Sequence, residues 1–96
     1  MEWGLQLGAT ELSRTRDLAQ AAEELGYGAL FVPDHILLEG PERSYDPNRL
    51  SLDPMVQIAV IAQATRRVRV GHLVLCNLFR HPAIMAQSLT TLDLLS

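Results

Sequence analysis

Two groups of polar side chains in this sequence have the types and spacing that acid–base or redox chemistry needs. Asp34 and His35 directly follow an apolar run that ends at Val32 and Pro33. A histidine at such a position can donate a hydrogen bond or transfer a proton near neutral pH, and the carboxylate before it could orient the imidazole or bind a ligand hydroxyl. In the structural alternative, Asp34 caps the loop and His35 bonds to backbone.

The second group is the segment CNLFRHP at residues 76–82, which follows another apolar run. Asn77 offers an amide donor and acceptor, and the guanidinium of Arg80 suits an anion. Without further context, the residue types favour a turn with a surface arginine. Cys76 favours a packing role over a nucleophilic one, because no base lies beside it in sequence.

A metal site could be imagined from three histidines and the cysteine, which are His35, His72, Cys76 and His81. Zinc sites usually show a tight pair of ligands such as CxxC or HExxH, and this sequence contains none. The pattern therefore predicts no metal.

The elements that must carry these side chains alternate between short apolar strands and helices. Strands are predicted at residues 3–8, 29–32 and 68–75, and helices at about 14–25, from 54 to about 65, and from 82 onward.

The helix ends have recognisable signals. Ser13 is the predicted N-cap of the first helix, and Gly26 its left-handed C-cap. A capping Asp53 before Pro54 starts the second helix, and His81 before Pro82 starts the third in the same way. Helical spacing predicts a buried stripe of Leu18, Ala22 and Leu25 on the first helix. It also predicts an apolar side of Ile84, Met85, Leu89, Leu92 and Leu95 on the third.

The segment 33–52 is polar, rich in proline and charged at residues 42–46. We expect a long irregular loop here, and such loops are usually functional or disordered.

Repeated strand–helix alternation predicts an α/β fold with a parallel sheet. The doubly wound nucleotide fold should show a glycine fingerprint after the first strand, and residues 8–13 contain neither GxGxxG nor a P-loop. The eight-fold TIM (β/α)8 barrel is therefore favoured. Because such a barrel needs roughly 250 residues, we interpret residues 1–96 as its first three βα units, an N-terminal fragment with the remainder absent.

Composition excludes several classes of protein. The net charge of −3 and the lack of a basic run argue against nucleic acid as a partner. The apolar runs are too short to span a bilayer, and the N-terminus lacks the pattern of a signal peptide. With one cysteine no internal disulfide is possible, which suits a reducing compartment. A cytoplasmic protein is expected.

An ordered set of segments resembles the N-terminal third of the luciferase-like monooxygenase superfamily, with the closest likeness to oxidoreductases that use the deazaflavin coenzyme F-420. These segments are AAEELGY at 21–27, LFVPDH at 30–35, DP at 53–54, TRRVRVG at 65–71, VLCN at 74–77, RHPA at 80–83 and TLDLLS at 91–96.

The resemblance implies a barrel that holds a flavin-type ring at its C-terminal end. It places Asp34 and His35 near the reactive edge of the ring and makes His35 the catalytic candidate. It also implies a non-proline cis peptide near Leu73 and Val74, behind the ring, with Cys76 and Asn77 lining the site. Some deazaflavin-dependent relatives carry a tryptophan shortly after the histidine, and this sequence has ILLE at 36–39 instead.

Three functions remain open. The first is hydride transfer to or from a small-molecule substrate through the deazaflavin coenzyme. The second, in the same family, is an FMN-dependent monooxygenase that uses molecular oxygen. The third is a non-catalytic fragment that self-associates as a homo-oligomer through an open sheet edge. On any of these readings, residues 1–96 alone are expected to be inactive.

Overall fold

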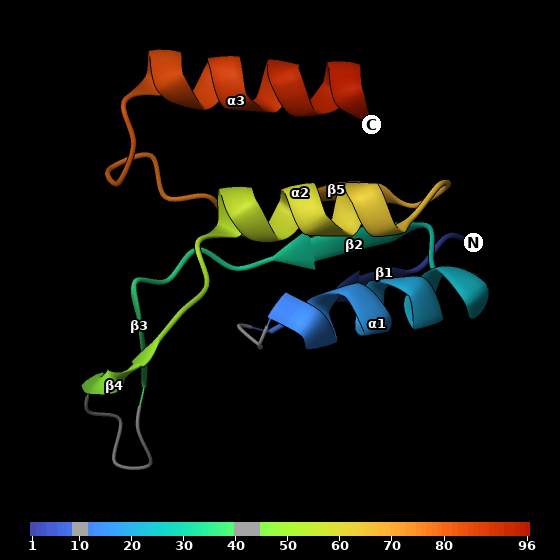
Figure 1. Cartoon of the computed structure of the whole chain (residues 1–96), viewed down its shortest axis with the longest axis horizontal. Helices are drawn as coiled ribbons and strands as arrows, with labels where there is room; N and C mark the ends of the chain where they lie inside the picture. Colours follow the sequence, from blue (N-terminus) through green and yellow to red (C-terminus); the bar gives the residue numbers. More distant parts are fainter. Residues whose placement is uncertain (9–11, 40–44) are drawn as a thin grey trace.

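The computed structural model describes residues 1–8, 12–39 and 45–96 of the chain (Figure 1). Parts of two predicted segments, the turn at 8–13 and the charged stretch at 42–46, lie outside these residues. The elements follow in the order β1 (Gly4–Gln6), α1 (Leu12–Glu24), β2 (Ala29–Val32), β3 (Leu37–Glu39), β4 (Tyr45–Leu50), α2 (Pro54–Ala64), β5 (Arg69–His72) and α3 (Pro82–Leu95).

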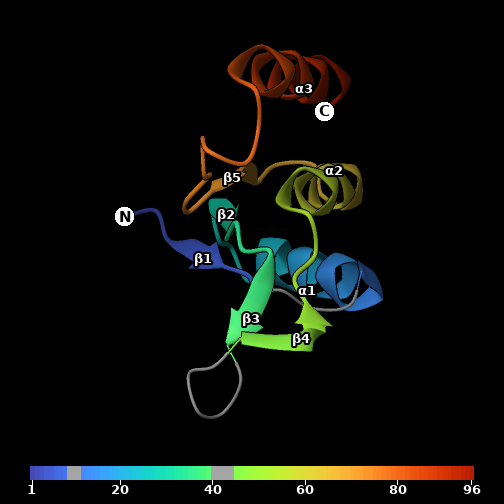
Figure 2. The ribbon, with the colours of Figure 1, turned by 90° about the vertical axis from the view of Figure 1, so that its left-hand side faces the viewer.

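The predicted parallel sheet is confirmed. Its strand order is β1-β2-β5, and both neighbouring pairs are parallel. Leu30 at the centre pairs with Leu5 on one side and with Val70 on the other. Figure 2 shows α1 and α2 on one face of this sheet, while the opposite face is uncovered. The three strand–helix units are thus an open α/β sheet, consistent with the N-terminal part of a TIM barrel.

Most of the predicted helix ends are also confirmed. Asp53 caps α2, with its carboxylate accepting from the N–H groups of Met55 and Val56 at 2.9 and 3.1 Å. Gly26 follows α1 with a φ of +89°, the left-handed conformation that glycine adopts without steric cost. The prediction for Ser13 is wrong, because α1 already begins at Leu12 and Ser13 lies inside its first turn.

Of the predicted buried stripe of α1, only Ala22 is confirmed. Thr15, Ala19 and Ala22 are buried, whereas Leu18 and Leu25 are 40% and 79% exposed. Both stripes satisfy the helical period, and the structure buries the smaller side chains because they let α1 pack closely against α2 and the sheet. The resulting core consists of Leu7, Ala19, Ala22, Leu30, Val32, Ile58 and Ile61.

The segment predicted as an irregular loop contains a β-ribbon. Strands β3 and β4 pair in antiparallel fashion, with Leu37 opposite Leu50 and Glu39 opposite Tyr45. Pro47 lies within β4, and this is tolerated because a two-stranded ribbon leaves one side of each strand unpaired. The prediction of an irregular loop is wrong here because it treated proline and charged residues as incompatible with a strand. Figure 1 shows the ribbon projecting away from the main sheet.

The third helix lies beyond the edge strand β5 and is loosely packed. None of its residues is buried, and Ile84 and Leu95 of its predicted apolar side are 59% and 71% exposed. Figure 2 shows α3 standing apart from the sheet. None of the helices in the described part of the chain is long and apolar enough to cross a bilayer.

Glu23 ties the end of α1 to the turn before β5, at the end of the sheet opposite the polar groups described above. Its carboxylate accepts hydrogen bonds from the backbone N–H groups of Arg66, Arg67 and Val68, at 2.9, 2.6 and 3.1 Å. The hydrogen bonds from Arg67 and Arg66 lower the pKa of Glu23 below its ordinary value of 4.5. The ionised form is therefore the one that the fold stabilises.

We expect Glu23→Gln to reduce the free energy of unfolding at neutral pH and to make stability less sensitive to acid. A carboxyl whose pKa is lowered by folding contributes stability above its unfolded pKa, and this is lost as the pH falls through the folded value. Urea unfolding of the complete barrel at pH 7 and at about pH 3 measures both effects. Glu24→Gln changes the exposed neighbouring carboxylate and is the matched control. An equal acid dependence in Glu23→Gln and wild type would contradict this account.

Candidate functional site

The C-terminal ends of β2 and β5 lie side by side and bring the two polar segments together. Val32 pairs with His72, and the N–H of Leu73 donates to the Val32 carbonyl at 2.9 Å. Two residues beyond β2, the Asp34 carboxylate accepts from the backbone N–H of Cys76 at 2.9 Å. Residues 42 positions apart in the sequence are thus in direct contact.

Arg80 lies at the centre of this contact, which the sequence analysis did not anticipate. Its Nη1 bonds to Asp34 Oδ2, and its Nη2 lies 3.3 Å from Asp34 Oδ1 and 3.0 Å from Asp53 Oδ2. The Arg80 side chain is 16% exposed and that of Asp34 only 1%. The expectation of a surface arginine is wrong. A carboxylate just after an apolar, largely buried strand needs a cationic partner, and this was the available signal.

The three charges of this cluster support one another. The hydrogen bond to Asp34 raises the pKa of Arg80 above its ordinary value. For Asp53, partial burial opposes ionisation, but hydrogen bonds from Val56 and Arg80 outweigh it and lower the pKa. Arg80 and Asp53 are therefore charged at neutral pH, and Arg80 bridges the carboxylates of Asp53 and Asp34.

His72 lies next to this cluster without being part of it. Its burial lowers the pKa of the imidazole, so the ring is neutral at physiological pH. Its Nε2 is buried, with no hydrogen-bond partner among the residues that the structure describes. His72 thus gives the cluster a neutral, partly buried neighbour.

The accessible groups at this end of the sheet are those that the resemblance assigned to the site. His35 and Asn77 are exposed, and Cys76 is half-buried. Leu73 and Val74 are 51% and 67% exposed and form an apolar surface.

The Leu73–Val74 peptide is cis, as the resemblance implied. The side-chain amide of Gln6 on β1 donates to the Leu73 carbonyl at 3.1 Å and holds this segment from the other side. The strand β5 ends at His72, three residues before its predicted end at Leu75, and the chain no longer pairs with β2 beyond Leu73.

The uncovered face of the sheet carries a single aromatic ring between glycines. A Cβ at Gly4 would lie 2.8 Å from the Phe31 ring, and one at Gly71 3.3 Å from it. These two positions suit glycine because the ring occupies the space of their side chains.

The remaining groups do not form an anion or metal site. Arg80, the candidate for a phosphate, already binds two carboxylates. The helix start at Pro82 is capped by His81, whose Nδ1 accepts from the Ala83 N–H at 3.2 Å. Among the described residues, no three histidine, cysteine or acidic side chains lie together as a metal site would require. Arg80 and the start of α3 thus both have internal partners in place of an anion.

Comparison with known proteins agrees with this geometry. A family model described as luciferase-like monooxygenase matches residues 2–96. The chain is similar to the F420-dependent glucose-6-phosphate dehydrogenases of Amycolatopsis mediterranei (39% identical over 84% of this chain) and Nakamurella multipartita (34% over 91%). It spans about a quarter of the length of these curated relatives, 24% in each case. The parallel strand–helix units and the family match over residues 2–96 show that the chain belongs to the luciferase-like monooxygenase family.

Proposed function

We propose that a complete barrel containing residues 1–96 is an oxidoreductase that transfers hydride between the deazaflavin coenzyme F-420 and a small-molecule substrate. The observation that carries the proposal is the exposed apolar surface of Leu73 and Val74 at the C-terminal end of the sheet. Active sites of barrel enzymes lie at this end. The names of the relatives support the choice of coenzyme.

Different residues of this chain would contact the coenzyme ring in different ways. Leu73 and Val74 offer an apolar surface to one side of a planar ring, while the amide of Asn77 supplies polar contacts and Cys76 lines the site. When bound, a deazaflavin supplies hydride transfer, and the protein supplies binding and orientation.

His35 is exposed at the same end of the sheet, next to the buried Asp34. We assign to its imidazole the task of holding or transferring a proton on the substrate. Asp34 does not share this task in our proposal, because both of its carboxylate oxygens are occupied by Arg80 and the Cys76 N–H.

Titration of the complete barrel with the deazaflavin coenzyme and, separately, with FMN tests the proposal. We expect tighter binding of the deazaflavin, followed by the absorbance change of its oxidised ring when substrate is added. A protein that purifies with FMN and consumes oxygen would instead be an FMN-dependent monooxygenase, an alternative that the description of the matching family favours. Failure to bind either coenzyme would overturn both.

A further inference from the structure

The cluster of Asp34, Arg80 and Asp53 joins three separate parts of the chain. Asp34 follows β2, Arg80 lies in the segment between β5 and α3, and Asp53 is the N-cap of α2. Arg80 contacts both carboxylates, so it fixes the segment after β5 against the end of β2 and the start of α2. No other described side chain in the ion pairs of this chain joins two partners.

Asp34 transmits this constraint to the candidate site. Its Oδ2 accepts from both Arg80 and the backbone N–H of Cys76. Asp34 is covalently next to His35, and Cys76 is next to Asn77. His35 and Asn77, the two exposed polar residues of the site, therefore each lie one residue away from the hydrogen bond between Asp34 and the Cys76 N–H. Arg80 holds the Asp34 side of that bond in place.

The chemistry of the arginine side chain matters here. Its planar guanidinium presents several N–H donors in fixed directions, which allows one side chain to bridge two carboxylates. A lysine ammonium keeps the charge but not this geometry. If Asp34 lost its partner, a carboxylate that is 1% exposed would remain buried without a cation, and such a charge is strongly unfavourable.

We propose that Arg80 is a positioning residue, which acts through Asp34 to set His35 and the Cys76–Asn77 segment relative to one another. The role in catalysis rests on the proposed function, but the positioning itself does not. Arg80 does not contact the substrate in this proposal. Its removal should move the site without removing any group that lines it.

The backbone N–H of Cys76 reports the positioning directly, because it donates the hydrogen bond to the Asp34 carboxylate. In the complete barrel we expect Arg80→Gln to speed amide hydrogen exchange at Cys76 about tenfold, the change that follows when local opening becomes about 1.4 kcal/mol easier. The ring resonances of His35 should shift in the same spectra. Arg80→Lys should show a smaller effect on both.

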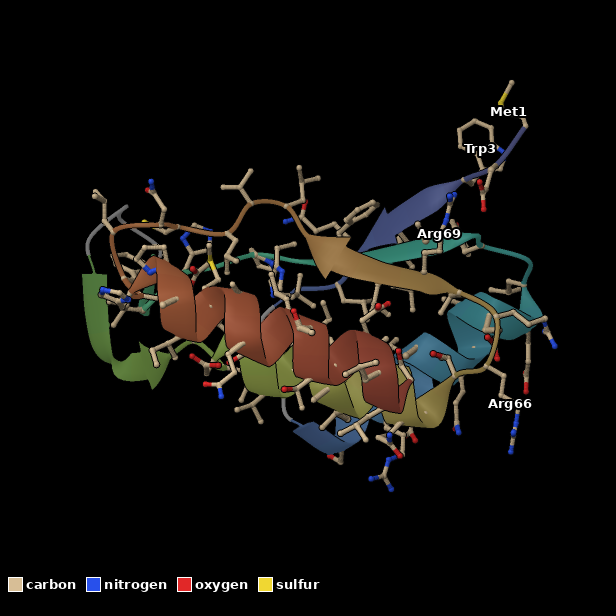
Figure 3. All side chains as sticks on the ribbon, turned by 90° about the horizontal axis from the view of Figure 1, so that it is seen from above. Met1, Trp3, Arg66 and Arg69 are labelled. Carbon is tan, nitrogen blue, oxygen red and sulfur yellow. The ribbon has the colours of Figure 1, made fainter. Side chains whose placement is uncertain are left out.

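Two comparisons separate local from global effects. The control variant is Arg69→Gln. Arg69 is the first residue of β5, so it lies at the end of this strand that is opposite the site, and its ion pair with Glu2 is exposed. Figure 3 shows Arg69 at that end, beside Trp3. This variant should leave the Cys76 amide and the His35 ring unchanged. The amide of Leu30, at the centre of the sheet, is the internal reference. Equal acceleration of exchange at Leu30 and Cys76 in Arg80→Gln would mean that the whole fold opens more often, and Arg80→Lys, which keeps the charge, then separates this global effect from a local effect on the site.

Unchanged exchange at Cys76 together with unchanged His35 resonances in Arg80→Gln would overturn the proposal. In an active enzyme, the same variant should lower kcat more than it raises the Kd of the coenzyme, with partial recovery in Arg80→Lys. A protein without deazaflavin activity would refute the proposed function alone, since the amide and ring measurements need no coenzyme.

Discussion

Replacing His35 with alanine is expected to lower kcat of the complete barrel by about 100-fold to 10,000-fold, the usual contribution of a general acid or base. The Kd of the coenzyme should change little. The reason is positional: His35 is exposed at the C-terminal end of the sheet, while Leu73, Val74 and Asn77 offer the surface for the ring. A loss in kcat without a matching loss of binding is the signature of a group that acts in the transition state.

His81→Ala is the matched control for this experiment. His81 is also an exposed histidine near the site, but its Nδ1 accepts from the Ala83 N–H and caps α3. Its loss should cost about 1 kcal/mol of stability, as for other N-caps, and should leave kcat unchanged. Steady-state kinetics and coenzyme titration on both variants supply the comparison. If His35→Ala retains the wild-type kcat, His35 takes no part in the chemistry.

Residues 1–96 on their own are expected to bind FMN or the deazaflavin coenzyme weakly or not at all, and to show no turnover. Arg80 and the start of α3 are already occupied by internal partners, so nothing in the candidate site holds a phosphate. Barrel enzymes commonly bind phosphate with loops after strands seven and eight. The chain spans only 24% of the length of these relatives.

The uncovered sheet face adds an energetic argument. Leaving roughly 400 Å² of apolar surface in water forfeits on the order of 10 kcal/mol at about 25 cal/mol per Å². That equals the whole stability of a typical domain, roughly 5–15 kcal/mol. We therefore expect residues 1–96 alone to be molten or aggregated, or to pair with copies of themselves through the open edge of β5.

Size-exclusion chromatography and coenzyme titration of the purified 96-residue chain test this expectation together. A self-associated or poorly folded chain without measurable coenzyme binding is the expected result. A folded monomer that binds either coenzyme at micromolar concentration would show that the candidate site needs no further strands.

The local signals in the sequence determined the order of the helices and of the main-sheet strands, and most of the helix ends. Asp53 before Pro54, His81 before Pro82 and Gly26 after α1 each act within one helical turn, because capping bonds join residues two to four positions apart. The strand at 29–32 was predicted at its observed bounds, since glycine and proline delimit it.

Where two local solutions were equivalent, the sequence did not choose between them. Leu18 and Leu25 share the helical period with Thr15, Ala19 and Ala22, and only the packing of α1 on α2 decides which side is buried. The β3–β4 ribbon was missed for a related reason. Its pairing is set by a partner strand and not by the composition of either segment.

The residues of the candidate site followed from the sequence and from the family resemblance. Parallel strands also imply that Asp34, Cys76 and their neighbours meet at one end of the sheet, as they do, but the ion pairs of Arg80 did not follow. Asp34 and Arg80 are 46 positions apart, and nothing in either local pattern indicates that they meet. Only the parallel pairing of β2 and β5 brings their segments together at one end of the sheet. Arg80, expected at the surface, is therefore largely buried and bridges two carboxylates. A charge that is removed from water is stable only when it is paired inside the fold.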